Sequence, residues 1–188
     1  MIDPQNITDY NRTDDELEEL LLFAAAVTGK TAVVIAKQLD NFLKYGPAGK
    51  SPFEKVKWMV KNGKLDFYLR NSSIGQYTRL NKAYRQIVKL KPRTCTVDDL
   101  EAVHGIGPKT ARFYLLHSRR NQRIAALDTH MVRFLREKGY TNLMNTPSSR
   151  SKYAELEAIF ITEADKAGKS VADFDLSIWN KYSKFGKK

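Results

Sequence analysis

Two glycines one residue apart, followed at once by a proline and a lysine, form the stretch of sequence with the clearest chemical use. Gly105 and Gly107 have no Cβ and can take left-handed backbone angles, so a bulky phosphate can approach the main chain closely. Ile106 would pin this turn to a core, and the free N–H groups at the start of the following helix would face the anion. Pro108 costs nothing at the first helical position, because the N–H that it lacks would be unpaired there in any case. A plain helical corner would use similar residues. We expect a hairpin that holds a phosphate backbone.

The lysine of this stretch has the chemistry of a nucleophile. An amine attacks carbon only when it is neutral, and a helix N-terminus in a partly desolvated cleft disfavours the charged form. Lys109 occupies such a position, directly after the hairpin. The alternative is that Lys109 makes one more phosphate contact.

Metal, disulfide and iron-sulfur sites are disfavoured by the residues that remain. His104, His117 and His130 include no pair at the i, i+4 spacing that chelates a metal on a helix. Cys95 is the only cysteine, which excludes an internal disulfide, a cysteine-rich zinc module and a four-cysteine cluster. We expect no catalytic metal and no cofactor, with Cys95 a buried space-filling residue.

Helices must position these residues, because helix start and stop signals are dense and strand signals are nearly absent. Residues 51–54, Ser-Pro-Phe-Glu, combine a serine cap, a proline at the first helical position and a capping-box glutamate, and Thr13 and Thr96 are similar caps. The expected helices cover about residues 14–29, 31–45, 52–63, 75–90, 97–105, 108–118, 131–139, 149–167 and 170–185, with a short turn at 65–69. The predicted fold class is all-α, with nine or ten short helices.

The charge of the chain points to a polyanionic partner. The 188 residues contain 32 Lys and Arg against 21 Asp and Glu, a net charge of +11. Residues 1–22 hold seven acidic residues and one arginine, so the rest of the chain is more basic than the total suggests. Nucleic acid is the simplest partner, and a scatter of solvated lysines is the alternative. Phosphate contacts are expected among Lys30, Arg112, Arg119, Arg120, Arg123, Lys181 and Lys184.

The hydrophobic pattern argues against a membrane protein. The longest apolar stretch, Leu20 to Val27, is far shorter than the roughly 18 residues that a spanning helix needs. No basic-then-apolar signal segment opens the chain. We expect a cytoplasmic protein that is associated with DNA and has no membrane partner.

Two motifs in the right order resemble the signature of the helix-hairpin-helix DNA glycosylase superfamily. They are the hairpin followed by Lys109, and residues 126–135, Ala-Leu-Asp-Thr-His-Met-Val-Arg-Phe-Leu. In the lyase-competent branches a lysine follows the hairpin glycines and an aspartate opens the later Asp-x-His segment. These positions fall on Lys109 and Asp128, so the resemblance implies glycosylase and lyase chemistry.

The resemblance implies a role for each of these side chains. Neutral Lys109 would attack the sugar C1′ of a flipped nucleotide, expel the base and leave a Schiff base whose 2′ proton is then lost, breaking the strand 3′ to the lesion. Asp128 would orient or deprotonate the lysine and stabilise positive charge on the sugar, although it would also suit a helix N-cap. His130 would support Asp128 or simply end a helix. The hairpin carbonyls would hold a weak monovalent cation against a DNA phosphate.

The end of the chain resembles the small archaeal and bacterial 8-oxoguanine DNA glycosylases of the second type. The likeness rests on Tyr153 and Glu157, then on Asp175 and Trp179, and on a chain that stops at Lys188. In those enzymes a late tryptophan precedes a C-terminal lysine whose terminus helps define the lesion pocket. The resemblance therefore places Asp175, Trp179 and Lys188 in the base pocket.

The turn between the first two expected helices departs from the superfamily pattern. Many members have a glutamine there, whereas this chain reads Thr-Gly-Lys-Thr at 28–31. Gly29 and Lys30 are therefore added to the base pocket, and the identity of the excised base stays open.

Together these observations predict one helical body with two lobes. Lobe one is expected from about 1–30 plus 140–188 and lobe two from about 31–139, with Lys109 and Asp128 facing the cleft. The expected protein is a monomeric, bifunctional DNA glycosylase/AP lyase that excises an oxidised purine, 8-oxoguanine by preference, from double-stranded DNA. The same chemistry on another modified or mismatched base, and a non-catalytic helix-hairpin-helix DNA-binding module, are the alternatives.

Overall fold

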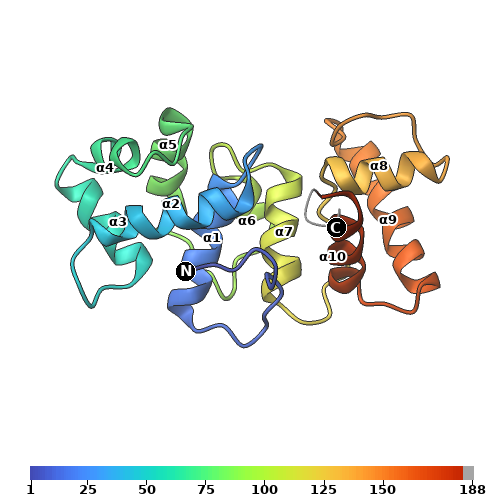
Figure 1. The fold of residues 1–188 in the computed structure, drawn as a ribbon, viewed down its shortest axis with the longest axis horizontal. Helices are drawn as coiled ribbons and strands as arrows, with labels where there is room; N and C mark the ends of the chain where they lie inside the picture. The colour runs from blue at the N-terminus through green and yellow to red at the C-terminus, as the bar shows by residue number, and fades with distance from the viewer. Residues whose placement is uncertain (184–188) are drawn as a thin grey trace.

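The computed structural model describes residues 1–183, and within them every regular element is a helix (Figure 1). Residues 184–188, and with them Lys188, lie outside the described residues. The helices are α1 (Asp14–Ala26), α2 (Ala32–Lys44), α3 (Pro52–Lys61), α4 (Leu65–Asn71), α5 (Tyr77–Ile87), α6 (Val97–Glu101), α7 (Pro108–Ser118), α8 (Thr129–Glu137), α9 (Arg150–Lys166) and α10 (Val171–Tyr182). The predicted all-α fold class is confirmed.

Helix starts follow the caps that the sequence encodes. The side chains of Thr13, Ser51 and Thr96 each accept a hydrogen bond from the N–H three residues on, and the acidic residue there accepts from the cap's N–H. These reciprocal bonds satisfy donors that the first helical turn leaves free. The expected turn at 65–69 is instead part of α4, because Leu65 and Leu69 lie one helical turn apart and both are buried.

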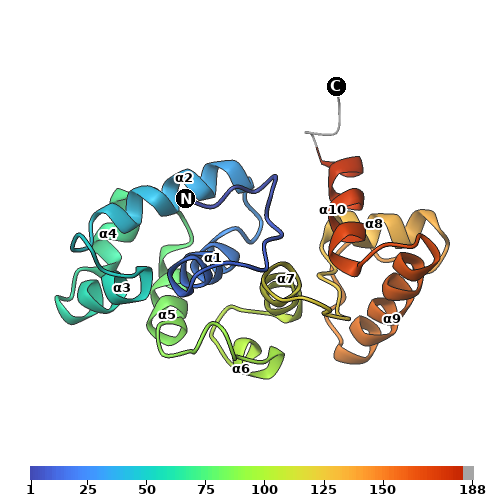
Figure 2. The same cartoon turned by 90° about the horizontal axis from the view of Figure 1, so that it is seen from below.

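Apolar side chains divide the structure into two bodies. One core cluster runs from Ile2 to Leu115 and the other from Leu116 to Ile178, so the boundary falls within α7. Figure 2 shows α1–α6 on one side of α7 and α8–α10 on the other. We refer to these as the first body and the second body.

This division corrects the lobes predicted from the sequence, which joined the N-terminal helix to the C-terminal helices. The main helix contacts of α1 are with α2, α3, α5 and α7. The physical reason is that residues 20–26 are all buried, whichever face of the helix they occupy. Because a helix that is apolar all round must be surrounded, α1 takes the centre of the first body.

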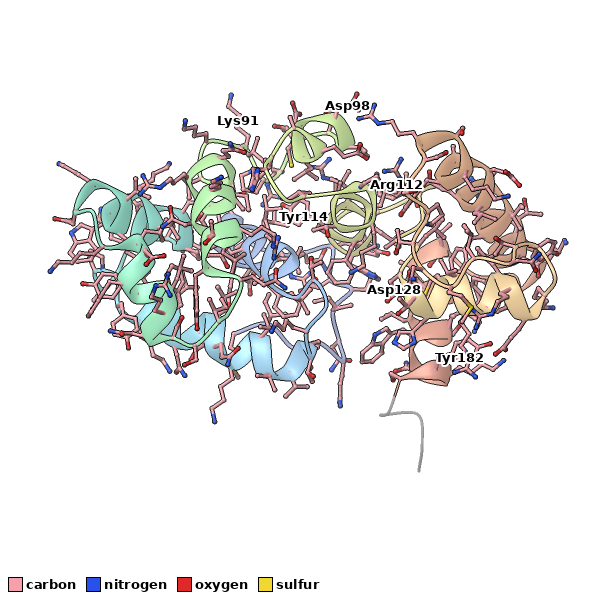
Figure 3. The ribbon with its side chains drawn as sticks, turned by 90° about the horizontal axis from the view of Figure 1, so that it is seen from above. Lys91, Asp98, Arg112, Tyr114, Asp128 and Tyr182 are labelled. Carbon is pink, nitrogen blue, oxygen red and sulfur yellow. The ribbon has the colours of Figure 1, made fainter. Side chains whose placement is uncertain are left out.

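Polar contacts tie the two bodies together. The Arg112 guanidinium of α7 donates from Nη1 to Glu101 Oε1 of α6 at 2.7 Å and from Nε to Glu157 Oε1 of α9 at 2.8 Å. It also lies over the Tyr153 ring, 4.7 Å from its centroid. Glu157 Oε1 accepts the N–H of Ala125 at 2.8 Å as well. Figure 3 shows Arg112 where the bodies meet, and we call Arg112, Glu101, Glu157 and Tyr153 the clamp.

The described residues contain neither a membrane-spanning helix nor a metal-binding cluster. None of their helices is both long and apolar enough to cross a membrane. They contain no group of three or more His, Cys, Asp or Glu side chains arranged to hold a metal ion. Cys95 is buried, and burial raises the pKa of its thiol.

Candidate active site

The hairpin between α6 and α7 has one left-handed glycine. Gly105 has φ +78°, and a Cβ there would lie 2.7 Å from Cγ of Arg79, so both angle and space require glycine. Gly107 is extended, with φ −102° and ψ 180°, so it does not use the left-handed angle that a glycine permits. A Cβ on Gly107 would meet nothing within 4 Å, so the protein's own packing leaves room in front of this residue. Ile106 is buried in the first body's core, as expected.

An arginine outside the motif holds the hairpin in place. Arg79 of α5 donates to the carbonyl of Gly105 at 3.0 Å, to that of Ala25 at 2.6 Å, and to Gln76 Oε1 at 2.6 Å. Gln76 donates in turn to the carbonyl of Thr28 at 2.7 Å. The hairpin and the turn at 28–30 are thus fixed to one another through α5.

A cavity of about 1020 Å³ lies between the two bodies. The first body contributes residues around the 28–32 turn, the hairpin and α7, and the second contributes the start of α8 and one face of α10. The predicted site residues that line it are Gly29, Lys30, Gly105, Gly107, Lys109, Thr110, Asp128, His130, Asp175 and Trp179. Residues far apart in sequence are therefore brought to one cavity.

Lys109 lies in the first turn of α7 and is half-buried. Its Nζ lies 5.0 Å from the ring centroid of Phe113, one helical turn further on. Within residues 1–183 no salt bridge engages this amine. It is therefore available to a ligand in the cavity.

Asp128 is the N-cap of α8, on the other side of the cavity. Its Oδ1 accepts the N–H of His130 at 2.7 Å and that of Met131 at 3.1 Å. Both bonds use the same oxygen, and Oδ2 has no hydrogen-bond partner among the described residues. Asp128 therefore caps α8 with one oxygen, and its second oxygen remains available to a ligand. Figure 3 shows Asp128 at the start of α8, on the side of the second body that faces the first.

The clamp also fixes the backbone just before Asp128. The Tyr153 hydroxyl donates to the carbonyl of Ala125 at 2.9 Å and accepts the N–H of Leu127 at 3.0 Å. Thr146 Oγ1 donates to the Leu127 carbonyl at 2.7 Å. The position of Asp128 relative to α7 thus depends on α9 side chains that also contact Arg112.

The remaining predicted pocket residues surround the same cavity. Gly29 has φ +67°, so the 28–30 turn uses glycine in a left-handed conformation, and Lys30 beside it is exposed. Trp179 is half-buried on α10, one turn after Asp175. Thr28 Oγ1 lies 3.5 Å from Thr110 Oγ1, which places this turn against the first turn of α7.

A buried carboxyl lies deeper in the cavity lining. Asp175 is 4% exposed, and burial is the main cause that raises the pKa of its carboxyl above the ordinary value, partly opposed by His117. Its Oδ2 lies 3.5 Å from Nε2 of His117, a fully buried residue of α7.

His117 lines the cavity, a role that the sequence analysis did not predict. Lys109, Phe113 and His117 follow one another at four-residue intervals on α7, and all three line the cavity. Asp175, Trp179 and Ser183 show the same interval along and just beyond α10. This periodicity was the available signal.

The predicted phosphate contacts also need correction. Arg112 is engaged by two carboxylates of the clamp and Arg123 by both oxygens of Asp165, at 3.1 and 2.8 Å. Each guanidinium is therefore already paired with a carboxylate, which offsets the charge that it could offer to a phosphate.

Comparisons with known proteins agree with the geometry. No family model matches the chain. The 8-oxoguanine DNA glycosylase/AP lyase of Methanocaldococcus jannaschii is 26% identical over 183 residues, which cover 94% of this chain and 84% of that protein. The crystal structure of the M. jannaschii 8-oxoguanine glycosylase/lyase in complex with DNA containing 8-oxoguanine has a TM-score of 0.68 at 20% identity, covering 97% of this chain and 87% of that one. The 8-oxoguanine DNA glycosylase of Thermotoga maritima has a TM-score of 0.65 at 19% identity, covering 91% and 81%.

The structural matches establish the fold, and the two motifs lie within it where the sequence places them, at the hairpin before α7 and at the start of α8. The chain therefore has the fold of the M. jannaschii and T. maritima 8-oxoguanine DNA glycosylases and, over nearly its whole length, is similar in sequence to the 8-oxoguanine DNA glycosylase/AP lyase of M. jannaschii.

Proposed function

We propose that this protein is a bifunctional DNA glycosylase/AP lyase that flips a damaged base out of duplex DNA and excises an oxidised purine, 8-oxoguanine by preference. The observation that carries the proposal is that Lys109 and Asp128 line one cavity from opposite bodies, beside a hairpin built for close backbone approach. The M. jannaschii relative, an 8-oxoguanine DNA glycosylase/AP lyase matched over 84% of its length, supports the choice of base.

The hairpin supplies the grip on DNA. The N–H groups at the start of α7 attract an anion through the helix dipole, and the open space at Gly107 lets a phosphate approach the main chain. The contact with one strand would hold the duplex while the damaged nucleotide turns into the cavity.

Lys109 is the nucleophile of the proposed reaction. Its neutral Nζ forms a bond to C1′, the glycosidic bond breaks, and the base leaves with the bonding electrons and gains a proton. Loss of the amine proton and opening of the sugar ring give a Schiff base between Nζ and C1′. Removal of the 2′ proton then expels the 3′ phosphate, and water releases the lysine.

Asp128 assists through the oxygen that the helix does not use. Oδ1 caps α8, so Oδ2 can accept a proton from the lysine or face positive charge on the sugar. The two N–H donors on Oδ1 fix the carboxyl group, which keeps Oδ2 in place during the reaction. His130 follows the cap and supports this arrangement through its backbone.

Borohydride trapping tests the mechanism directly. Borohydride reduces a Schiff base to a stable amine, so incubation with a duplex containing 8-oxoguanine should give a covalent protein–DNA band that undamaged duplex does not give. Absence of the band under conditions where the damaged duplex binds would overturn the proposed chemistry. That result would favour the alternative of a non-catalytic DNA-binding module. The Asp128 carboxylate in the cavity argues against this alternative, because a carboxylate repels phosphate.

A second candidate is the same chemistry on another modified or mismatched base. The observation in its favour is the exposed Lys30 beside Gly29, in the turn where many superfamily members carry glutamine. A panel of duplexes, each with one modified base, distinguishes the two by which duplex is cleaved.

We also propose that a monovalent cation binds the hairpin when DNA is present. The Gly105 carbonyl already accepts from Arg79 and the Val103 carbonyl accepts the Ile106 N–H, so such an ion would rely on the Ile106 carbonyl and on the phosphate itself. Replacing K⁺ by a bulky organic cation at equal ionic strength would weaken DNA binding if this ion contributes.

We further propose that the protein acts on DNA as a monomer and that it works in the cytoplasm.

A further inference from the structure

Three buried polar atoms in the described residues have no hydrogen-bond partner, and all three belong to residues that line the cavity. They are Nε2 of His117, Oδ1 of Asp175 and Oγ of Ser183. Buried polar atoms are nearly always paired, because leaving one unpaired costs about 1–3 kcal/mol. Nε2 of His117 faces Oδ2 of Asp175 at 3.5 Å, the distance of an ion pair. Oδ1 of Asp175 and Oγ of Ser183 have no partner among the described residues, which indicates that this part of the cavity is complete only when a ligand supplies donors.

Contacts with Thr8, Asp9, Arg12 and Phe113 hold His117 in place. Its Nδ1 lies 2.8 Å from Thr8 Oγ1, and its backbone carbonyl accepts from the N–H of Asp9 at 3.2 Å and from Arg12 Nη1 at 3.0 Å. The ring also packs edge-on against Phe113, with centroids 4.9 Å apart. When the Thr8 hydroxyl donates to Nδ1, the ring hydrogen lies on Nε2, which faces Asp175.

We propose that His117 is a positioning residue for recognition of the extruded base. Its Nε2 faces Oδ2 of Asp175 at the 3.5 Å distance of an ion pair and orients the carboxyl group, so that Oδ1 and Oγ of Ser183 are the oxygens left to bind the base. The inference rests on the proposed function and assigns a further residue to it.

The arrangement selects a chemical class of base. A carboxylate oxygen and a hydroxyl oxygen accept hydrogen bonds, so they match a base edge that carries neighbouring N–H donors. Guanine-type purines have such an edge in N1–H and the 2-amino group, whereas an adenine-type base presents an acceptor at N1. A base without these donors would leave Asp175 buried and unpaired.

Base recognition and strand cleavage are separable in this scheme. An abasic site still has the sugar that Lys109 attacks, but it has no base for Asp175 to bind. His117 should therefore matter for excision and not for cleavage at a pre-formed abasic site.

The experiment compares His117→Phe and His117→Gln with the wild-type chain under single-turnover conditions. Each protein is given a duplex with 8-oxoguanine and a matched duplex with an abasic site. His117→Phe keeps a buried ring but has no donor, and we expect its maximal excision rate to fall about 10- to 100-fold. Its abasic-site cleavage should stay within about twofold. His117→Gln carries an amide N–H near the position of Nε2 and should recover most of the excision rate.

Ser118→Ala is the matched control. Ser118 is the next residue on α7, is equally buried, and donates only to the Tyr114 carbonyl at 2.6 Å without lining the cavity. It should leave both rates unchanged. If His117→Phe does not fold, Thr8→Val removes the Nδ1 partner and should give a smaller loss confined to excision.

The outcomes separate this inference from the proposed function. A wild-type chain that cleaves neither duplex overturns the proposed function. A wild-type chain that cleaves both, with His117→Phe slowing both equally or neither, leaves the function intact and overturns the role of His117. An excision rate of His117→Gln that is no higher than that of His117→Phe would also overturn the role of His117.

Discussion

Two carboxyl groups line the same cavity, and their surroundings are opposite. Asp128 is half-buried at a helix N-terminus, where two backbone N–H groups bind one of its oxygens. Asp175 is buried in the middle of α10, where its Oδ2 lies 3.5 Å from Nε2 of His117 and its Oδ1 has no hydrogen-bond partner within residues 1–183. The pKa of Asp175 is raised by burial.

This difference matches the two proposed roles, in which Asp128 takes part in the chemistry and Asp175 recognises the base. A carboxylate with one oxygen fixed by backbone N–H groups and the other without a hydrogen bond suits proton transfer and stabilisation of a cation. A carboxyl group kept from water and left incompletely paired suits a ligand that restores its hydrogen bonds. If this division is correct, substitutions near Asp128 will act on every substrate and substitutions near Asp175 will act on those that carry a base.

The largest effect should come from Lys109, the proposed nucleophile. If Lys109 has that role, Lys109→Gln removes the attacking amine, so strand cleavage and borohydride trapping should fall at least about a thousandfold. DNA affinity should change only a few-fold, since Lys109 is one phosphate neighbour among several. Gel-based cleavage and equilibrium binding measure the two quantities. Trapping that persists in the variant would place the nucleophile elsewhere.

The next effect tests whether Asp128 is more than a cap. Asn caps helices as well as Asp does, so Asp128→Asn should retain the melting temperature. It lacks the negative charge, and turnover should fall about a hundredfold on both 8-oxoguanine and abasic duplexes. Full activity with an unchanged melting temperature would show that Asp128 is only a helix cap. The proposed chemical role of Asp128, and with it the contrast with Asp175, would then be wrong.

The hairpin region could be predicted because its signals are local. Caps, a proline at the first helical position and glycines at a turn act over a few residues, and they gave the starts of α3, α6 and α7 correctly. The angles of the two hairpin glycines could not be predicted, because a glycine permits many conformations and the sequence does not say which one is used. The all-α class followed from the same local signals.

The arrangement of the two bodies depends on contacts that no local pattern records. The bonds from Arg79 to Gly105 and Ala25 join residues distant in sequence, and nothing near Arg79 indicates them. The lobe division was wrong because apolar spacing shows that α1 is buried but not among which helices. The roles predicted for the site residues stay predictions until activity is measured.

A smaller effect should come from the clamp that holds both carboxyl regions against α7. The Arg112 and Glu157 side chains are only 16% and 13% exposed, so removing one partner leaves the other incompletely paired. Arg112→Ala should lower the free energy of unfolding by about 2–3 kcal/mol. Chemical denaturation measures the change.

The second body offers a matched control for this substitution. Arg133 and Glu137 form an exposed pair at 2.8 Å, 52% and 43% exposed, and Arg133→Ala should cost under about 1 kcal/mol. Equal losses in the two variants would show that the clamp behaves as an ordinary surface pair. The position of Asp128 would then have to be explained by Tyr153 and Thr146 alone.

The smallest effect concerns the pH dependence of stability at Asp175. A raised pKa in the folded state means that the protonated carboxyl stabilises the fold below its ordinary value of 3.8, and that this contribution is lost as the pH rises through the folded pKa. Asp175→Asn stays neutral at every pH. Its melting temperature should therefore match that of the wild type near pH 4 and exceed it by a few degrees near neutral pH, since about 1 kcal/mol corresponds to roughly 2–4 °C in a chain of this size.

An acidic residue with the opposite shift makes this test specific. Asp99 accepts from the N–H and hydroxyl of Thr96, which lowers the pKa of its carboxyl, so its contribution is present above 3.8 and is lost as the pH falls. Asp99→Asn should therefore be less stable than the wild type near neutral pH, and the difference should shrink in acid. The two variants should thus diverge from the wild type in opposite directions as the pH rises. A flat difference for Asp175→Asn would show that His117 compensates the buried charge fully, and Asp175 would then resemble Asp128 rather than contrast with it.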